Sequence, residues 1–145
     1  MFAQLDTKSV YSFMDSVVDL NSYVARAKEL GYQALGLMDR DNLYAAYHFA
    51  QLASRNGLRP LIGMEANLFY EGRKIPFRLL AKNNQGYKNL MKLATELSSG
   101  QREFTAFSDY LNAIALILPS EDWESGMTLG SEVFIGAVSY THLRA

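Results

Sequence analysis

Two acidic residues, Asp39 and Glu65, come directly after short apolar runs and are the first candidates for a functional site. The runs are 34–38 (ALGLM) and 61–64 (LIGM), each too short for a helix and apolar enough for a covered strand. In α/β proteins, ligands bind at the edge of the sheet where strands end and loops begin. We therefore expect both carboxylates at that edge, in a position to bind a ligand.

A helix is predicted between these two strands. Asp and Asn side chains at 39–42 can cap its start, and Asn56-Gly57 supplies the residues that end it. From Leu43 onward, apolar residues recur at helical spacing, and the predicted buried stripe is Leu43, Ala46, Tyr47, Ala50 and Ala53. The whole stretch therefore predicts a strand, a helix and a second strand.

The flanking sequence predicts further elements of the same kind. Residues 2–6 alternate as in a first strand, and a helix begins after Asp19 and ends at Gly31. A hairpin is expected from 66–70 and 75–81, followed by a helix that Asn83-Asn84 caps. The apolar face of that helix is predicted to comprise Tyr87, Leu90, Met91, Ala94 and Leu97. A short helix from Ser108, a strand over 113–118, a helical turn capped by Ser120 and a strand starting at Val133 follow.

Composition restricts the possible classes of protein. The 145 residues suit one domain or a piece of a larger one, and 49% hydrophobic content is enough for a core. The sequence has no cysteine, no apolar run near the ~20 residues that span a bilayer, and no signal peptide, so we expect a cytoplasmic protein without membrane attachment. The net charge of -1 does not favour broad binding to nucleic acid. Residues 71–92 are locally basic, which favours a solvated face over a contact with DNA or a neighbouring domain.

Four segments together carry a resemblance to a known family: FAQLDTKSVYSFMDS, AKELGYQALGLMDRDNLYAAYHF, GLRPLIGMEA and LLAKNNQGYKNLMKLATEL. In order and spacing, from about Phe2 to Leu118, they resemble the N-terminal PHP (polymerase and histidinol phosphatase) domain of bacterial DNA polymerase III alpha subunits, closest to the low-GC Gram-positive type. The resemblance implies an α/β fold, a distorted TIM-like βα barrel of which residues 1–137 are an incomplete part.

The resemblance also indicates where a metal site would lie. Active PHP domains carry a His-x-His pair, another His two residues later, an Asp-His pair and a Gly-x-Glu motif, which hold metals for phosphoester hydrolysis. In this sequence the corresponding positions are Gln4, Asp6, Lys8, Asp39, Arg40 and Glu65. Asp39 and Glu65 match, Asp6 is an acidic substitute, and every histidine at these positions is replaced.

The replaced histidines change the chemistry of the site. Imidazole nitrogen is a strong ligand for zinc-like ions, whereas a protonated lysine or arginine has no lone pair to offer. We hypothesise that Lys8 and Arg40 take the place of the metal among the carboxylates and leave a vestigial cleft with no catalytic residue and no metal. The alternative for Asp39, Asp41 and Asn42 is a helix cap, and Asp6, Lys8 and Arg40 could equally be ordinary solvated charges. His48 is expected to be a packed or surface residue, and Tyr44 and Tyr47 to be core or rim.

Two functions remain in competition. The first is a structural segment of a replicative polymerase, whose later palm domain would use Mg²⁺ for DNA synthesis and whose partners would be the rest of the alpha subunit, the replisome and DNA. On this reading the segment itself needs no cofactor. The second is a metal-dependent PHP phosphoesterase or proofreading exonuclease, against which the missing histidines count. Residues 138–145 (VSYTHLRA) resemble a translated transposon-type sequencing adapter, so we treat them as a non-native tail.

Overall fold

The computed structural model of the chain describes residues 3–9, 11, 19–130 and 132–136. The predicted adapter-derived tail lies outside this part. Within it the sheet has six strands: β1 (Ala3–Gln4), β2 (Ala34–Arg40), β3 (Arg59–Tyr70), β4 (Arg73–Ala81), β5 (Ile114–Pro119) and β6 (Val133–Gly136). The helical elements are α1 (Leu20–Glu29), α2 (Ala46–Arg55), α3 (Asn84–Ser98) and the 3₁₀ segments η1 (Phe104–Tyr110) and η2 (Ser120–Asp122).

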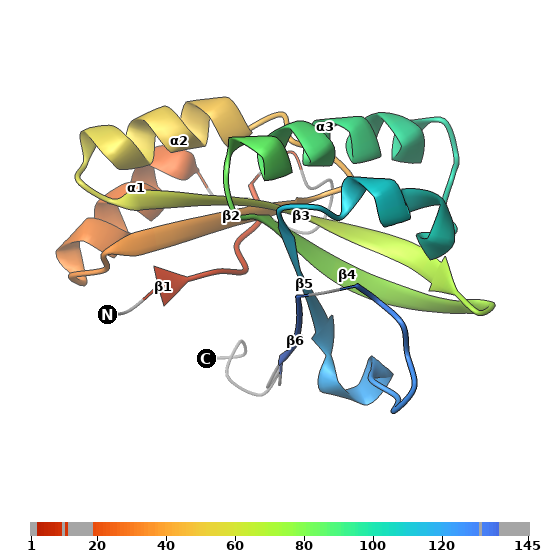
Figure 1. Cartoon of the computed structure of the whole chain (residues 1–145). Helices are drawn as coiled ribbons and strands as arrows, with labels where there is room; N and C mark the ends of the chain where they lie inside the picture. The colour runs from red at the N-terminus through yellow and green to blue at the C-terminus, as the bar shows by residue number, and fades with distance from the viewer. Residues whose placement is uncertain (1–2, 10, 12–18, 131, 137–145) are drawn as a thin grey trace.

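The strands lie in the sheet in the order in which they occur in the chain. β1, β2 and β3 are parallel, β4 is antiparallel to both of its neighbours, and β6 runs parallel to β5. The sheet curls, so that β5 and β6 turn downward from the plane of β2 and β3 (Figure 1). This curled half-barrel is the architecture of an incomplete TIM-like barrel, as the sequence predicted, and the predicted hairpin is formed by β3 and β4.

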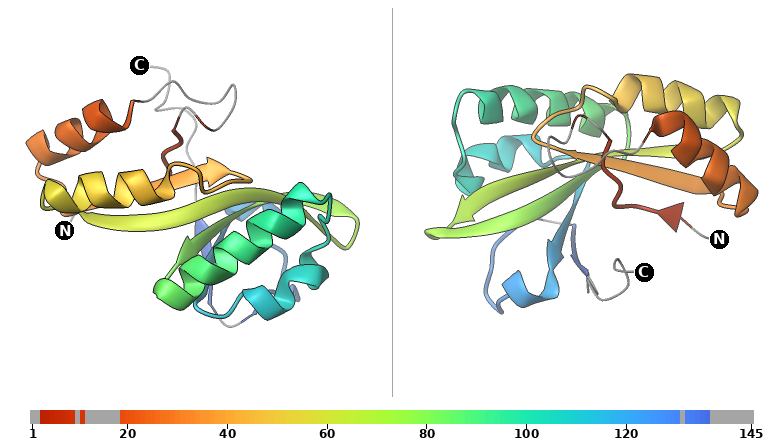
Figure 2. Two further views of the ribbon diagram at one scale, coloured as in Figure 1. Left: turned by 90° about the horizontal axis from the view of Figure 1, so that it is seen from above. Right: turned by 180° about the vertical axis from the view of Figure 1, so that it is seen from behind.

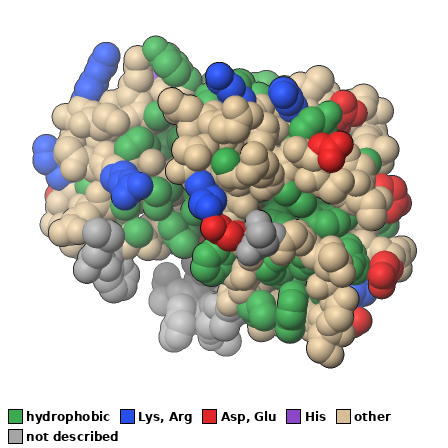
Figure 3. Space-filling model, viewed as in Figure 1, with side chains coloured by type: hydrophobic (Ala, Val, Ile, Leu, Met, Phe, Trp, Pro, Cys, Tyr) green, Lys and Arg blue, Asp and Glu red, His purple; other side chains and the backbone are tan. Residues whose placement is uncertain are grey.

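α2 and α3 cover the same face of the sheet, and among the described residues no helix lies on the opposite face between β2 and β4 (Figures 1 and 2). Two buried clusters form the core on the helical side. One lies where α1 and α2 pack on β2, around Leu35 and Phe49, and the other lies where α3 and η1 pack on β3–β5, around Phe77 and Leu93. The space-filling view shows hydrophobic side chains at the surface below the helices (Figure 3).

Most helix ends are where the sequence places them. The Asp19 carboxylate accepts a hydrogen bond from the Ser22 N–H (3.0 Å), and Asn83 Oδ1 accepts one from the Gly86 N–H (3.0 Å), so both are N-caps. Gly57 follows α2 with φ +77°, a conformation in which a side chain would be strained. Each of these capping signals depends only on neighbouring residues, so it begins or ends a helix independently of the rest of the fold.

The start of α2 differs from the prediction. The helix begins at Ala46 instead of Leu43, and its N-cap residue, Ala45, makes no side-chain capping bond. The 39–42 segment therefore does not cap α2, because β2 continues through Arg40 and Asn42 Oδ1 instead accepts a bond from the Tyr44 N–H (3.2 Å).

The buried faces of α2 and α3 are also rotated from those predicted. Phe49 takes the central buried place in α2, while Tyr44 and Tyr47 are 78% and 70% exposed and so are not core residues. In α3, Asn89 and Leu93 are buried and Met91 is 42% exposed. An aromatic ring at the edge of an apolar stripe gives the same periodic signal whether it points inward or along the surface.

The other differences are small. η1 begins at Phe104, four positions before the predicted start at Ser108, and Pro119 precedes η2 where Ser120 was expected to cap it.

None of the helices in the described part of the chain is long and apolar enough to cross a membrane.

Candidate functional site

Glu65 lies in the middle of β3 and not at a strand end as predicted, because β3 runs on for five residues to Tyr70. Its register partner on β2 is Arg40, and the partner of Asp39 is Met64, which is buried in the core beneath α3. Side chains alternate between the two faces of a strand. Arg40 and Glu65 therefore share the face away from the helices, and Asp39 belongs to the other face.

The Glu65 carboxylate is held by two cations that come from different segments of the chain. Arg40 Nη2 and Nε lie 3.1 and 3.3 Å from Glu65 Oε1, and Lys8 Nζ lies 3.0 Å from Oε2. Glu65 is only 5% exposed, whereas the Arg40 side chain is 42% exposed, so the carboxylate is buried and the Arg40 guanidinium partly reaches solvent. Both cations proposed from the sequence thus reach a carboxylate.

Asp6 joins the same group of charges. Lys8 Nζ donates to Asp6 Oδ1 at 3.4 Å, and Arg78 Nη2 forms an ion pair with Asp6 Oδ2 at 2.7 Å. The backbone at Leu5 approaches β2 so closely that a Cβ at Gly36 would lie 2.5 Å from Leu5 O. Glycine at position 36 therefore lets the 4–6 segment lie against the sheet and places Asp6 beside Glu65.

Arg78 is the member of the site that the sequence-based reading missed. It is 8% exposed, and its buried Nε lies 3.9 Å from Glu65 Oε2, beyond hydrogen-bond distance. A signal for it existed. The two-residue turn at 71–72 pairs Tyr70 with Arg73, and continuing this antiparallel register pairs Glu65 with Arg78. We call Asp6, Lys8, Arg40, Glu65 and Arg78 the Glu65 cluster.

Asp39 is bound differently. It is 1% exposed, and both of its carboxylate oxygens accept hydrogen bonds from Ser9, one from the N–H and one from the hydroxyl, each at 2.6 Å. The Met38 N–H also donates to Thr7 O (2.7 Å), so residues 7–9 follow the end of β2. Asp39 therefore fastens the segment after β1 to the sheet and does not cap a helix.

The remaining predicted positions lie apart from these contacts. Gln4 pairs in register with Leu35 and is exposed, and His48 lies on the exposed side of α2. Asp41, next to Arg40, adopts φ +56° and forms a two-pronged ion pair with Arg102 at 2.8 and 2.9 Å. This hydrogen bond to Asp41 raises the pKa of Arg102 above its ordinary value.

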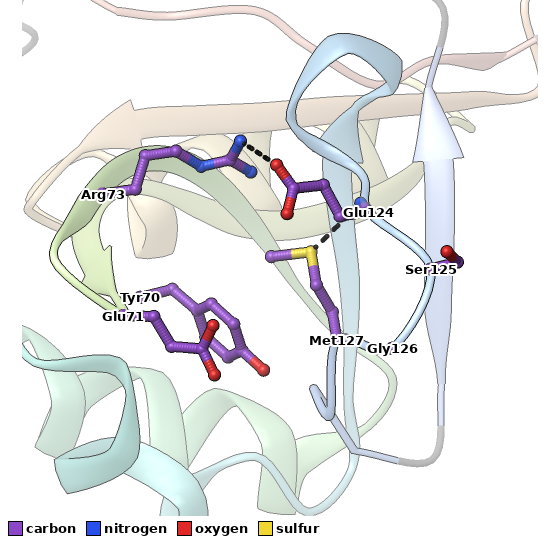
Figure 4. A pocket seen from close by; sticks show the side chains of 7 residues that line it. All are labelled: Tyr70, Glu71, Arg73, Glu124, Ser125, Gly126 and Met127. Carbon is purple, nitrogen blue, oxygen red and sulfur yellow. Dashed lines mark hydrogen bonds and ion pairs between the residues drawn. The ribbon is translucent and has the colours of Figure 1, made fainter.

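The basic 71–92 stretch does not form one patch. Arg78 belongs to the Glu65 cluster, Arg73 forms an ion pair with Glu124 (2.7 Å), and Lys82 forms one with Glu132 (2.6 Å). Arg73 and Glu124 line a cavity of about 260 Å³ between the β3–β4 turn and the 124–127 loop (Figure 4). The Tyr70 hydroxyl closes the same corner by accepting a bond from the Thr128 N–H (2.9 Å).

The fold and the matching positions define the class of this protein. The family model described as the PHP domain matches residues 4–130, and the chain belongs to that family. The chain is also 47% identical over 143 residues to the N-terminal region of the DNA polymerase III subunit alpha of Streptococcus pyogenes serotype M1. The match covers 99% of this chain and 14% of that relative, so the chain spans a small part of its length.

A more distant relative and a solved structure are also similar to this chain. The DNA polymerase III subunit alpha of Bacillus subtilis (strain 168) is 33% identical over 126 residues, covering 83% of this chain and 11% of that protein. Among solved structures, a protein from Bifidobacterium adolescentis described as a metal-dependent phosphoesterase matches with a TM-score of 0.54 and 16% identity. That match covers 65% of this chain and 32% of the other chain, and at this identity it shows a shared fold alone.

Proposed function

We propose that this chain is the N-terminal PHP segment of the alpha subunit of a DNA polymerase III, in which the family's metal position has become a structural ion-pair cluster. The observation that carries the proposal is the occupation of both Glu65 oxygens by cations, Arg40 on one and Lys8 on the other. The parent protein would synthesise DNA with Mg²⁺ in a later domain, and its partners would be DNA and the other replisome subunits.

The residues around Glu65 do not fit a divalent metal. A metal needs several lone pairs directed at one point, but Lys8, Arg40 and Arg78 offer only hydrogen-bond donors. The part of the chain that the structure describes contains no group of three or more His, Cys, Asp and Glu side chains that could hold a metal. We therefore assign no hydrolytic step and no catalytic residue to this segment.

The cluster also has the connectivity of a structural device. Its five residues come from the segment after β1, from β2, from β3 and from β4, so a single group of charges joins four parts of the sheet. A bound metal would join the same elements through its ligands. Ion pairs can fulfil this role without the metal, provided that every buried charge keeps a partner.

Metal analysis of the full-length protein from the natural gene tests this proposal. We expect no stoichiometric zinc, manganese or iron after gel filtration, and no phosphoester hydrolysis that depends on Glu65. The Glu65→Gln variant is the matched control, since it removes the carboxylate on which any metal or hydrolysis at this site would depend. Retained metal that is lost in Glu65→Gln, together with loss of hydrolysis, would favour a phosphoesterase instead.

The gene downstream of Gly136 provides a second test. A continuation of polymerase length with a palm-type aspartate cluster is expected, because the S. pyogenes relative is matched over only 14% of its length. A natural stop shortly after Gly136 would contradict the assignment to a polymerase subunit.

A further inference from the structure

Two tyrosines at the start of α2 are the most exposed large hydrophobic side chains in the described residues. Tyr44 is 78% and Tyr47 is 70% exposed. Each ring has one side-chain contact that favours its present orientation. The Tyr47 hydroxyl accepts a bond from Gln51 Nε2 (2.7 Å), and the Tyr44 ring lies edge-on to Tyr11 with centroids 6.1 Å apart. Rings held in place in this way lose little conformational entropy when a partner covers them.

These tyrosines border a groove between α2 and α3. Two cavities of about 340 and 290 Å³ both have Tyr87 in their lining, one bounded by α2 and the start of α3 and the other by residues 41–44 and the rest of α3; together they are here called the α2–α3 groove. Tyr47 lines it from α2, and Tyr87 and Met91 line it from α3. Both helices rest on the same face of the sheet (Figure 2), and side chains of both line the cavity that includes Tyr47 and Tyr87.

The two ends of the α2–α3 groove differ in charge. At one end lie Arg59 and Lys82, both exposed; Lys82 forms an ion pair with Glu132, whereas Arg59 has no acidic partner among the residues that the structure describes. At the other end Asp41 and Arg102 neutralise each other. A complementary occupant would therefore be apolar along its length and acidic at the Arg59 end.

We propose that the α2–α3 groove is the docking site for an amphipathic helix from the remainder of the same polypeptide, with acidic residues at the end that meets Arg59. This inference rests on the proposed function, because it requires a longer chain. The S. pyogenes relative is matched over 14% of its length, so most of a protein of that size lies outside this segment and must pack against it or beside it.

The geometry favours a helix over other occupants. A depression between two helices that is walled by Tyr and Met side chains is a site into which the apolar face of a third helix inserts. Tyr and Met are enriched in the buried centres of interfaces, and Lys is depleted there. A single strand of nucleic acid would need cations along the whole groove, whereas the end at Asp41 and Arg102 is neutral.

Hydroxyl-radical footprinting of the full-length protein without DNA tests the proposal. Tyr44 and Tyr47 should react with hydroxyl radicals at least about fivefold more slowly than their exposure in this segment implies, because the centres of interfaces exclude water. Leu30, which is 53% exposed at the end of α1, is the internal control and should react at the rate of an exposed side chain. Unprotected tyrosines in a long polymerase chain would overturn this proposal and leave the proposed function intact.

Variants and changes in the labelling conditions distinguish the possible occupants of the α2–α3 groove. Tyr47→Ala should raise the labelling of Tyr44 and Met91 several-fold, whereas Leu30→Ala should leave it unchanged. Protection that appears only after addition of a single-stranded oligonucleotide would mean that nucleic acid is the occupant, and protection that grows with protein concentration would mean a second copy; either result overturns the proposal. A gene that ends shortly after Gly136 would overturn both this inference and the proposed function.

Discussion

Arg40 and Asp41 are neighbours in the chain, yet they take part in two ion-pair systems of different kinds. Arg40 binds Glu65 in a cluster of five charged residues, in which Glu65 and Arg78 form a buried centre at 5% and 8% exposure, while the Arg40 and Asp6 side chains reach the surface at 42% and 33%. Asp41 pairs with Arg102 alone, and both side chains are about one-third exposed, at 31% and 33%. The difference shows that the fold separates charges that are adjacent in sequence into a buried network and a surface pair.

The degree of burial decides how much each ion-pair system contributes to the stability of the fold. A surface pair gains little because water screens it, even with good geometry. A buried group of charges does not need to stabilise the fold relative to an apolar core, but removing one member leaves the others unpaired in a poorly solvated place. The Glu65 cluster should therefore be sensitive to single substitutions, and the Asp41–Arg102 pair should tolerate them.

The largest expected effect comes from Glu65→Gln in the full-length protein. It would leave Lys8, Arg40 and Arg78 with Asp6 as the one remaining carboxylate of the cluster, and removing one partner of a buried pair in this way costs about 3–5 kcal/mol. Hydrogen exchange of peptides from β2, β3 and β4 measures this loss of local stability. The control is Glu124→Gln, which removes an exposed partner of Arg73. Equal effects of the two variants would erase the distinction between buried network and surface pair.

The next effect should come from Asp39→Ala, which removes a buried acceptor for two hydrogen bonds from Ser9. Hydrogen bonds to a charged group contribute about 1.5–3 kcal/mol. Ser9→Ala removes only the hydroxyl and should cost distinctly less, as measured by exchange of the peptide that contains residues 7–9. If Ser9→Ala were as costly as Asp39→Ala, the backbone N–H bond to Asp39 would carry none of the stability.

Tyr23→Phe tests a buried polar contact without charge. The Tyr23 hydroxyl donates to Gly36 O (3.0 Å), and its loss should cost about 1 kcal/mol. Burial raises the pKa of Tyr23 from 10.0 to about 12. Because the folded-state pKa is the higher one, this contribution is present below pH 10 and disappears as the pH rises toward 12. The free energy of unfolding, measured between these pH values, should fall more steeply in the parent than in Tyr23→Phe. Parallel curves would contradict the raised pKa of Tyr23.

The smallest effect is expected for Arg102→Gln. The variant loses the two-pronged contact with Asp41, which at this exposure contributes about 0.2–1 kcal/mol and less in high salt. Local unfolding measured at low and high ionic strength should show a difference from the parent only at low salt. A large, salt-independent loss would mean that this pair behaves like the Glu65 cluster.

Local signals in the sequence predicted most of the elements and part of the site. Asp19, Asn83 and Gly57 end or begin helices as expected, because capping depends on a few neighbouring residues. Lys8, Arg40, Asp6 and Glu65 were brought together by the family resemblance, and the structure places them in contact. Their role in place of a metal remains a proposal.

The features that the sequence did not predict depend on contacts between segments that are distant in the chain. Arg78 is found only by extending the hairpin register from its turn, and Ser9 carries no signal that distinguishes it from an ordinary loop serine. The expectation that Asp39 and Glu65 lie together at one edge failed for a similar reason. Alternation along β2 sends Asp39 to the face opposite Arg40, and the strand prediction ended at residue 38, two residues too early to show this. Tyr47 was misplaced in the buried stripe of α2 because periodicity does not distinguish a core edge from a surface.

The route of the chain through the Glu65 cluster has a consequence for synthesis on the ribosome. Asp6 and Lys8 emerge early, but Arg78, their neighbour on β4, emerges only after two helices and two strands have followed them. Until then the carboxylates and amines of the growing chain stay hydrated, and the first strand has no complete sheet to join. Closure of the sheet therefore waits for contacts between distant segments, which slows folding and leaves the nascent N-terminus open to chaperones while the polypeptide lengthens.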